Sequence, residues 1–60
     1  MNERLRARRE TQGKTQQEIA DFAGISLKSY QRIEKGVQDP AVSIAKLIAK
    51  CLKSTVEKLF

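Results

Sequence analysis

The chain has 60 residues, with 12 Lys and Arg, 7 Asp and Glu, one cysteine and no histidine. A domain of this length buries only about 60% of its unfolded surface, which excludes a deep catalytic cavity. The single Cys51 excludes an intrachain disulfide, and the most apolar stretch is broken by Lys46 and Lys50, which excludes a membrane span. These features predict a cytoplasmic protein. The net charge of +5 favours a polyanionic partner, although it also promotes solubility.

A single all-α domain over residues 1–60 is predicted, because no segment alternates with the two-residue period of a strand. Its first helix is expected over about residues 2–12. Asn2 is the expected capping residue, since its side chain can accept from a free backbone amide of the first turn. The apolar spacing turns Leu5 and Arg9 inward.

The second helix is expected over residues 16–23. Thr15 and Glu18 have the spacing of a capping box, in which each side chain accepts from the other residue's backbone amide. Gly24 is expected to end this helix in the left-handed conformation. Its inner positions are predicted to be Ile19, Ala20 and Ala23.

The third helix is expected over residues 27–35, with Ser26 as its cap, Tyr30 and Ile33 inside, and Gly36 at its end. A fourth helix is expected over residues 41–52, and a short fifth helix over residues 56–60. Asp39 and Pro40 are predicted to start the fourth helix as a cap and a first-turn proline. Its inner stripe is predicted to comprise Val42, Ala45, Ile48, Ala49 and Leu52.

The second and third helices, joined at Gly24, have the arrangement of a helix-turn-helix unit. The small residues before the turn let the two helices approach closely. The third helix then keeps an outer face made of Leu27, Lys28, Gln31 and Arg32. Such a face suits the DNA major groove, because Lys and Arg can donate to guanine, Gln can pair with adenine, and an aliphatic side chain can meet a thymine methyl.

The segment TQQEIADFAGISLKSYQRIEKG is preceded by LRARRETQGK and followed by DPAVSIAKLIAKCL. From Leu5 to Phe60 the chain resembles the Cro/C1-type (Xre-like) helix-turn-helix family of phage and bacterial repressors. The resemblance implies a compact five-helix lambda-repressor-like fold with residues 26–35 as the recognition helix. It also implies that Leu27, Lys28 and Arg32 contact bases, that Gln16 contacts the DNA backbone and braces the recognition helix, and that Arg9 and Glu34 form a partly buried ion pair.

Four residues depart from the family pattern. Arg8 and Lys14 stand at positions that are often aliphatic, so the first helix is expected to bury less surface. Tyr30 replaces a common Ile or Val, and its hydroxyl needs a partner or access to solvent. Lys53 stands where glycine is frequent, so it must adopt a left-handed conformation at some cost or end the fourth helix differently.

The fourth helix carries a second apolar stripe formed by Ile44, Leu47 and Cys51. Two alternatives could cover it. The fifth helix could fold back over it, or a twofold partner could bury Ile44, Leu47 and Phe60. A homodimer is favoured, because symmetric dimers that read palindromic half-sites are the usual use of this motif.

The sequence therefore predicts specific binding of double-stranded DNA by a transcriptional repressor or regulator that acts as a dimer on a palindromic operator. Base contacts are expected from Leu27, Lys28, Gln31 and Arg32. Phosphate contacts are expected from Gln16, Gln17, Ser29, Lys35 and Arg9. An antitoxin or a restriction–modification controller shares the same pattern, and a protein-interaction module on the same fold is the alternative class. An enzyme, a cofactor and a metal site are not expected, because the chain has no histidine, no carboxylate pair, no glycine-rich phosphate loop and no metal-ligand cluster. A membrane partner is disfavoured because the caps and glycines divide the chain into short packed helices, and no small-molecule ligand is evident.

Overall fold

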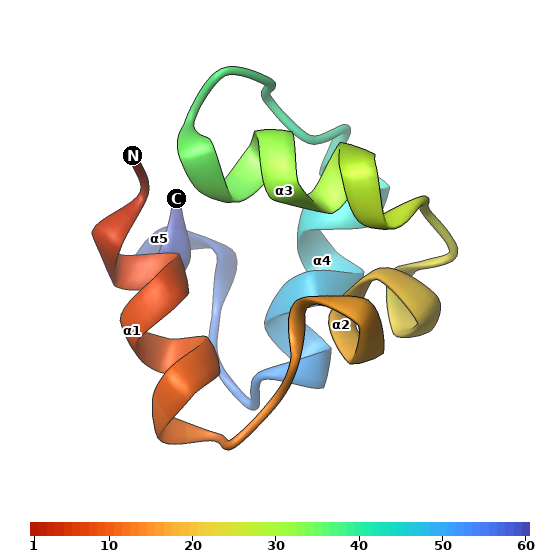
Figure 1. The fold of residues 1–60 in the computed structure, drawn as a ribbon. Helices are drawn as coiled ribbons and strands as arrows, with labels where there is room; N and C mark the ends of the chain where they lie inside the picture. The colour runs from red at the N-terminus through yellow and green to blue at the C-terminus, as the bar shows by residue number, and fades with distance from the viewer.

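The computed structural model describes residues 1–60 and consists of five α-helices without a strand. The helices are α1 (Glu3–Thr11), α2 (Gln16–Ala23), α3 (Leu27–Lys35), α4 (Val42–Cys51) and α5 (Val56–Leu59). The predicted all-α class is confirmed. Figure 1 shows α2 and α3 crossing in front of α4, with α1 and α5 side by side at the end where the two termini meet.

The first three helices begin at the predicted caps. The Asn2 carboxamide accepts from the Leu5 amide at 3.0 Å, and the Ser26 hydroxyl accepts from the Ser29 amide at 3.1 Å. Thr15 and Glu18 form both hydrogen bonds of the predicted capping box. These side chains satisfy backbone amides that have no partner inside the helix, which defines the residue at which each of these short helices begins.

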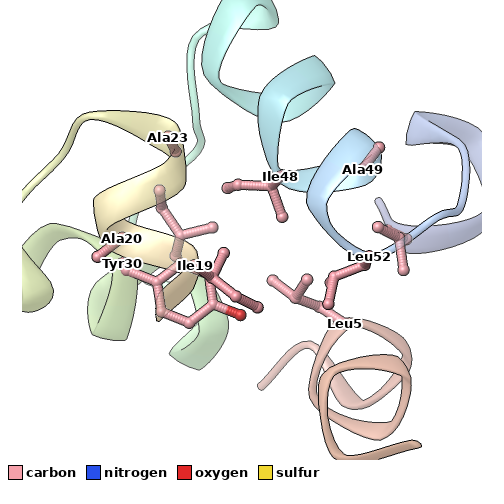
Figure 2. Close-up of a cluster of buried hydrophobic side chains, with 10 residues drawn as sticks. Leu5, Ile19, Ala20, Ala23, Tyr30, Ile48, Ala49 and Leu52 are labelled. Carbon is pink, nitrogen blue, oxygen red and sulfur yellow. The ribbon is translucent and has the colours of Figure 1, made fainter. Parts of the chain in front are cut away.

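The core lies where all five helices converge (Figure 2). α2 packs against both α3 and α4, whereas α5 packs against α1 and α4. Burial of these side chains stabilises the fold by about 25 cal/mol for each Å² removed from water. The fully buried large side chains are Leu5, Ile19, Tyr30, Ile48, Leu52 and Leu59.

The start of α4 differs from the prediction. Asp39 does not cap the helix and Pro40 does not lie in its first turn. The N-terminal cap is the backbone of Ala41, which makes no side-chain capping bond. Residues 37–41 connect the end of α3 to the start of α4, and Val42 is the first helical residue (Figure 1). Val42 was predicted to be buried, but it is 71% exposed because it lies at the tip of the helix.

The second apolar stripe of α4 is half-buried. Ile44, Leu47 and Cys51 pack against the core cluster, as do Val56 and Phe60 from the region of α5. α5 itself contacts α4. Part of each of these side chains is therefore covered within the chain, and the rest stays exposed.

Arg8 has a role that the sequence did not predict. Its Nε donates to the Leu52 carbonyl at 2.8 Å, and its Nη2 donates to the Lys53 carbonyl at 2.9 Å. These carbonyls follow the last turn of α4, where backbone acceptors lack partners within the helix. Arg8 thus ties α1 to the end of α4 by hydrogen bonds, in place of the apolar contact that an aliphatic residue would make.

Lys53 adopts the left-handed conformation with φ of 54°, one of the two outcomes expected for a lysine at this position. We expect Lys53→Gly to raise the free energy of unfolding by less than about 1 kcal/mol. Glycine removes a left-handed strain of roughly 1–2 kcal/mol, but it also has more freedom to lose on folding. Urea unfolding with an unchanged m-value would measure the difference, and a destabilised variant would contradict the expectation.

With ten residues in α4, the longest helix falls well short of the roughly 20 apolar residues that a bilayer crossing requires.

Candidate nucleic-acid interface

α3 has one buried face and one exposed face. Tyr30, Ile33 and Glu34 point into the protein, and the helix packs across α2 through them. The opposite face carries Lys28 and Arg32, followed at the next helical turn by Lys35, and all three are exposed. Neither of the two ion pairs in the structure, Arg6–Glu10 and Arg9–Glu34, involves these three basic residues. A row of cationic side chains therefore faces solvent along the whole of α3.

Leu27, Ser29 and Gln31 flank this row and are half-buried. All the residues predicted to contact bases thus lie on the outer side of α3 or at its edge. The structure does not place them equally, since Lys28 and Arg32 are exposed, Leu27 is half-buried, and half-buried Gln31 hydrogen-bonds to Gln16 of α2.

The turn between α2 and α3 sets the direction of this face. Gly24 has φ of 72°, and the Ile25 amide donates to the Ala20 carbonyl at 3.0 Å. Ala20 and Ala23 are buried at this corner, where their small side chains allow the two helices to lie close together. Only glycine adopts this positive φ without steric strain, so the turn can reverse the chain within a few residues.

Arg9 and Glu34 connect α1 to α3. The Arg9 Nε and Nη2 each donate to one carboxylate oxygen of Glu34 at 2.9 Å, a bidentate pair. Glu34 is only 4% exposed. Burial by itself raises the pKa of Glu34. The hydrogen bonds and positive charge of Arg9, together with contributions from Tyr30 and Gln16, outweigh burial and hold the pKa below its ordinary value. The same pair raises the pKa of Arg9.

Arg9 has its guanidinium turned inward. Besides Glu34, it donates through Nη1 to the Lys14 carbonyl at 3.1 Å. The prediction that Arg9 contacts phosphate is therefore not supported by its placement, because its donors serve the pair with Glu34 and the loop before α2. We exclude Arg9 from the residues proposed to contact DNA.

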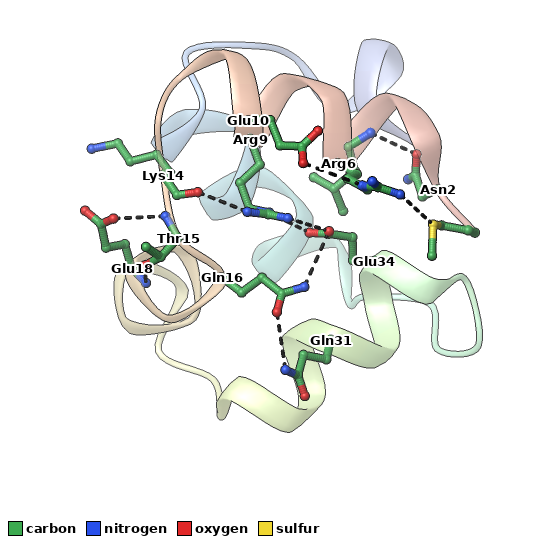
Figure 3. Close-up of polar contacts among 12 residues, drawn as sticks. Asn2, Arg6, Arg9, Glu10, Lys14, Thr15, Gln16, Glu18, Gln31 and Glu34 are labelled. Atoms are coloured by element: carbon green, nitrogen blue, oxygen red, sulfur yellow. Dashed lines mark hydrogen bonds and ion pairs between the residues drawn. The ribbon is translucent and has the colours of Figure 1, made fainter.

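Gln16, at the start of α2, lies between the ion pair and α3 (Figure 3). Its Nε2 donates to Glu34 Oε1 at 3.4 Å, and its Oε1 accepts from Gln31 Nε2 at 3.2 Å. The side chain thus braces α3, as the family resemblance implied. The bond to Gln31 was not predicted, because the two residues are 15 positions apart and no periodic pattern connects them.

The first amides of α2 and α3 are suited to phosphate oxygens. Capping side chains satisfy the third amide of each helix, at Glu18 and Ser29. The amides of Gln16 and Gln17 precede the first intrahelical bond of α2, so helix geometry leaves them available to an external acceptor. The Gln17 side chain itself donates to Asp21 at 2.8 Å on the exposed side of α2.

The Tyr30 hydroxyl behaves differently from the expectation. Tyr30 is fully buried, and its oxygen is directed into the core cluster (Figure 2), where it makes no hydrogen bond. It neither reaches the surface nor finds a partner of good geometry, although it lies near enough to Glu34 to help lower the pKa of that carboxyl. Desolvation strongly raises the pKa of Tyr30, so the hydroxyl stays neutral.

We expect Tyr30→Phe to leave the free energy of unfolding unchanged or to raise it by up to about 1 kcal/mol. The substitution removes a buried hydroxyl without a partner and keeps the ring that fills the core. Thermal unfolding of the two proteins would measure the change. A loss of stability would instead show that the hydroxyl hydrogen-bonds to Glu34 in solution.

A short helix that holds a second, outwardly basic helix across a glycine turn is the architecture of helix-turn-helix DNA-binding domains. Residues 5–59 match the model of a family described as helix-turn-helix. A protein of Archaeoglobus fulgidus described as an uncharacterized HTH-type transcriptional regulator is 33% identical over 60 residues, which span 100% of this chain and 86% of that protein. The chain belongs to the Cro/C1-type helix-turn-helix family of DNA-binding regulators, as the sequence motifs predicted.

Proposed function

We propose that this protein represses transcription by binding a specific duplex DNA sequence with α3 in the major groove. The observation that carries the proposal is the unpaired row of Lys28, Arg32 and Lys35 along the exposed face of α3. A row of this kind meets the negative potential of DNA, and an α-helix has the width that the major groove accepts.

Two kinds of contact follow from the positions of the side chains. Base contacts are assigned to Leu27, Lys28, Gln31 and Arg32, which lie on the outer side of α3 or at its edge. Phosphate contacts are assigned to the backbone amides at the start of α2 and to α3 residues beside the base contacts. These are Gln16, Gln17, Ser29 and Lys35.

We further propose that two copies bind together on a palindrome. Ile44, Leu47 and Phe60 are each half-buried against the core of one copy, which leaves part of each side chain for a second copy. Sedimentation of the protein with a palindromic duplex is expected to give two chains per duplex. Saturation at one chain per palindrome would contradict the dimer and leave single-site binding intact.

Selection from random duplex DNA at near-physiological salt, read by sequencing, tests the proposal as a whole. We expect enrichment of a palindrome whose half-sites are about one helical turn, or 34–36 Å, apart. A single enriched half-site would support sequence-specific binding by a monomer. If no sequence were enriched, the assignment of α3 as a recognition helix would fail, and a protein partner would be the next class to examine.

A further inference from the structure

Apolar side chains reach the surface where α2 and α4 pack against each other. They are Phe22 on α2 and Leu47 and Cys51 on α4, and we call this set the α2–α4 seam. Phe22 is 49% exposed, and Leu47 and Cys51 are half-buried. An exposed aromatic side chain beside further apolar side chains is typical of a surface that binds another molecule.

The two helices of the seam run in opposite directions. α2 contacts α4 along its length. Figure 2 shows Ala23 above Ile19 on α2, whereas Ile48 lies above Leu52 on α4. The end of α2 therefore lies beside the earlier part of α4, and the start of α2 lies beside the end of α4.

Charges near Cys51 show which sides of the helices face the seam. Burial raises the pKa of the Cys51 thiol, the charge of Lys14 lowers it, and the charge of Glu18 raises it. Cys51 thus lies on the side of α4 that faces the start of α2. Leu47 is one turn before Cys51, and Phe22 is one turn after Glu18, so both continue the same side of their helices.

The seam has flanks of opposite charge. Glu18 and Asp21 lie on the outer surface of α2, and Lys46 and Lys50 lie on the outer surface of α4. All four are exposed, and none takes part in the two ion pairs of the structure. The two carboxylates accept hydrogen bonds from neutral amide groups, which do not cancel their charge.

A second copy of the chain complements this surface if the twofold axis runs along the seam. Such an axis exchanges the two sides, so the acidic flank of each copy faces the basic flank of the other. It also brings Phe22 of one copy over Leu47 of the second copy. An axis across the seam would place like charges against each other, and like charges in an interface oppose that arrangement.

The same axis suits binding to one duplex. Figure 1 shows α4 beginning behind α3 and running away from it, so α3 lies at one end of the seam. Rotation about an axis along the seam keeps both copies of α3 at that end, where a single duplex can meet both. An axis across the seam would send them to opposite ends. Charge and DNA geometry therefore favour one arrangement for independent reasons.

We infer that two copies bind a palindrome by pairing through the α2–α4 seam, with the acidic flank of each copy against the basic flank of the other. The inference rests on the proposed function and names the surface and the orientation of the pairing. It keeps Leu47 from the residues assigned to the pairing above, and it adds Phe22 and both charged flanks. Burial of the exposed half of Phe22 supplies the apolar contact at its centre.

Phe22→Ala tests the apolar part of the seam. The quantity measured is cooperativity, the factor by which a copy on one half-site raises the affinity for the other. Titrations of the selected palindrome, and of the same duplex with one half-site scrambled, give this factor. We expect Phe22→Ala to lower cooperativity about tenfold, as truncation of a central aromatic residue commonly does, and to keep the wild-type affinity for the single half-site.

Val37→Ala is the matched control for Phe22→Ala. Val37 is also an exposed apolar residue, at 73% exposure, but it lies in the loop after α3 and outside the seam. It should keep the wild-type cooperativity. Unchanged cooperativity in Phe22→Ala, or an equal loss in Val37→Ala, would overturn the inference.

The double variant Lys46→Gln, Lys50→Gln tests the orientation by the sign of its effect. Removal of lysines that face acids lowers cooperativity, whereas removal of lysines that face lysines raises it. We expect a loss. The control is Arg4→Gln, Lys58→Gln, which changes the net charge equally at exposed residues outside the seam. Unchanged or raised cooperativity in the first double variant would overturn the inference.

The remaining outcomes separate the inference from the proposed function. If no duplex sequence were enriched in the selection, the proposed function would fail and the inference with it. A single enriched half-site, or a palindrome with wild-type cooperativity in both seam variants, would remove the inference alone. If Phe22→Ala failed to bind even the single half-site, it would be treated as unfolded. The lysine double variant, which changes only exposed side chains, would then decide.

Discussion

Glu34→Ala is expected to lower the free energy of unfolding by about 3–5 kcal/mol, because it strands the charge of Arg9 in a site that is nearly closed to solvent. A domain of 60 residues has a total stability on the order of 3–9 kcal/mol. The variant should therefore be largely unfolded at temperatures at which the wild-type protein is still folded. Thermal and urea unfolding followed by circular dichroism would measure the loss.

The matched control is the double variant Arg9→Met, Glu34→Met. It removes both charges and keeps side chains of similar length, so no charge is left buried alone. Replacement of a buried ion pair by apolar residues is often neutral or stabilising. We therefore expect the double variant to recover much of the stability that Glu34→Ala loses. Equal instability of both variants would mean that the packing at this site, and not the stranded charge, accounts for the effect.

The Arg9–Glu34 ion pair makes the free energy of unfolding depend on pH in the acidic range. Because the pKa of Glu34 in the folded protein lies below its ordinary value of 4.5, the stability that the pair contributes is present above that pH. It is lost as the pH falls through the lowered pKa of the folded state. The double variant should lack this part of the acid dependence, which unfolding curves between neutral pH and strongly acidic pH would show.

Arg32→Ala is expected to weaken specific DNA binding by about 1–3 kcal/mol and to relax the preference at one base position. Arg32 lies on the outer face of α3, and its guanidinium can bind the two acceptors of guanine at once. Fluorescence anisotropy with the selected duplex and with single-base variants would measure both the affinity and the preference. A uniform loss across all sequences would identify Arg32 as a phosphate contact instead.

Lys35→Ala is the matched control for Arg32. Lys35 belongs to the same exposed row but is assigned to phosphate, so its removal should weaken binding to every sequence alike. The slope of log affinity against log salt concentration should fall in magnitude by about 1, since one fewer counterion is released. An altered base preference would reverse the assignments of the two residues.

The helix positions followed from local chemistry. Asn2, Thr15 and Ser26 each cap the helix that they were expected to cap, and Gly24 and Gly36 take the left-handed conformation after α2 and α3. Caps and glycine turns act within four residues, so a sequence contains the whole interaction. The prediction was wrong at the start of α4, where Asp39 does not cap the helix and Pro40 does not lie in its first turn.

The sequence by itself determined which helices form, which residues they bury except at Val42, and that a basic helix faces outward, because periodicity and capping are local properties. Only the tertiary structure decided the contacts between distant residues. Arg8 binds the end of α4 across 44 positions, Gln16 bonds to Gln31 across 15, and the Tyr30 hydroxyl lies in the core without a partner. Such contacts depend on the angle and distance at which helices pack, and no local pattern encodes either quantity.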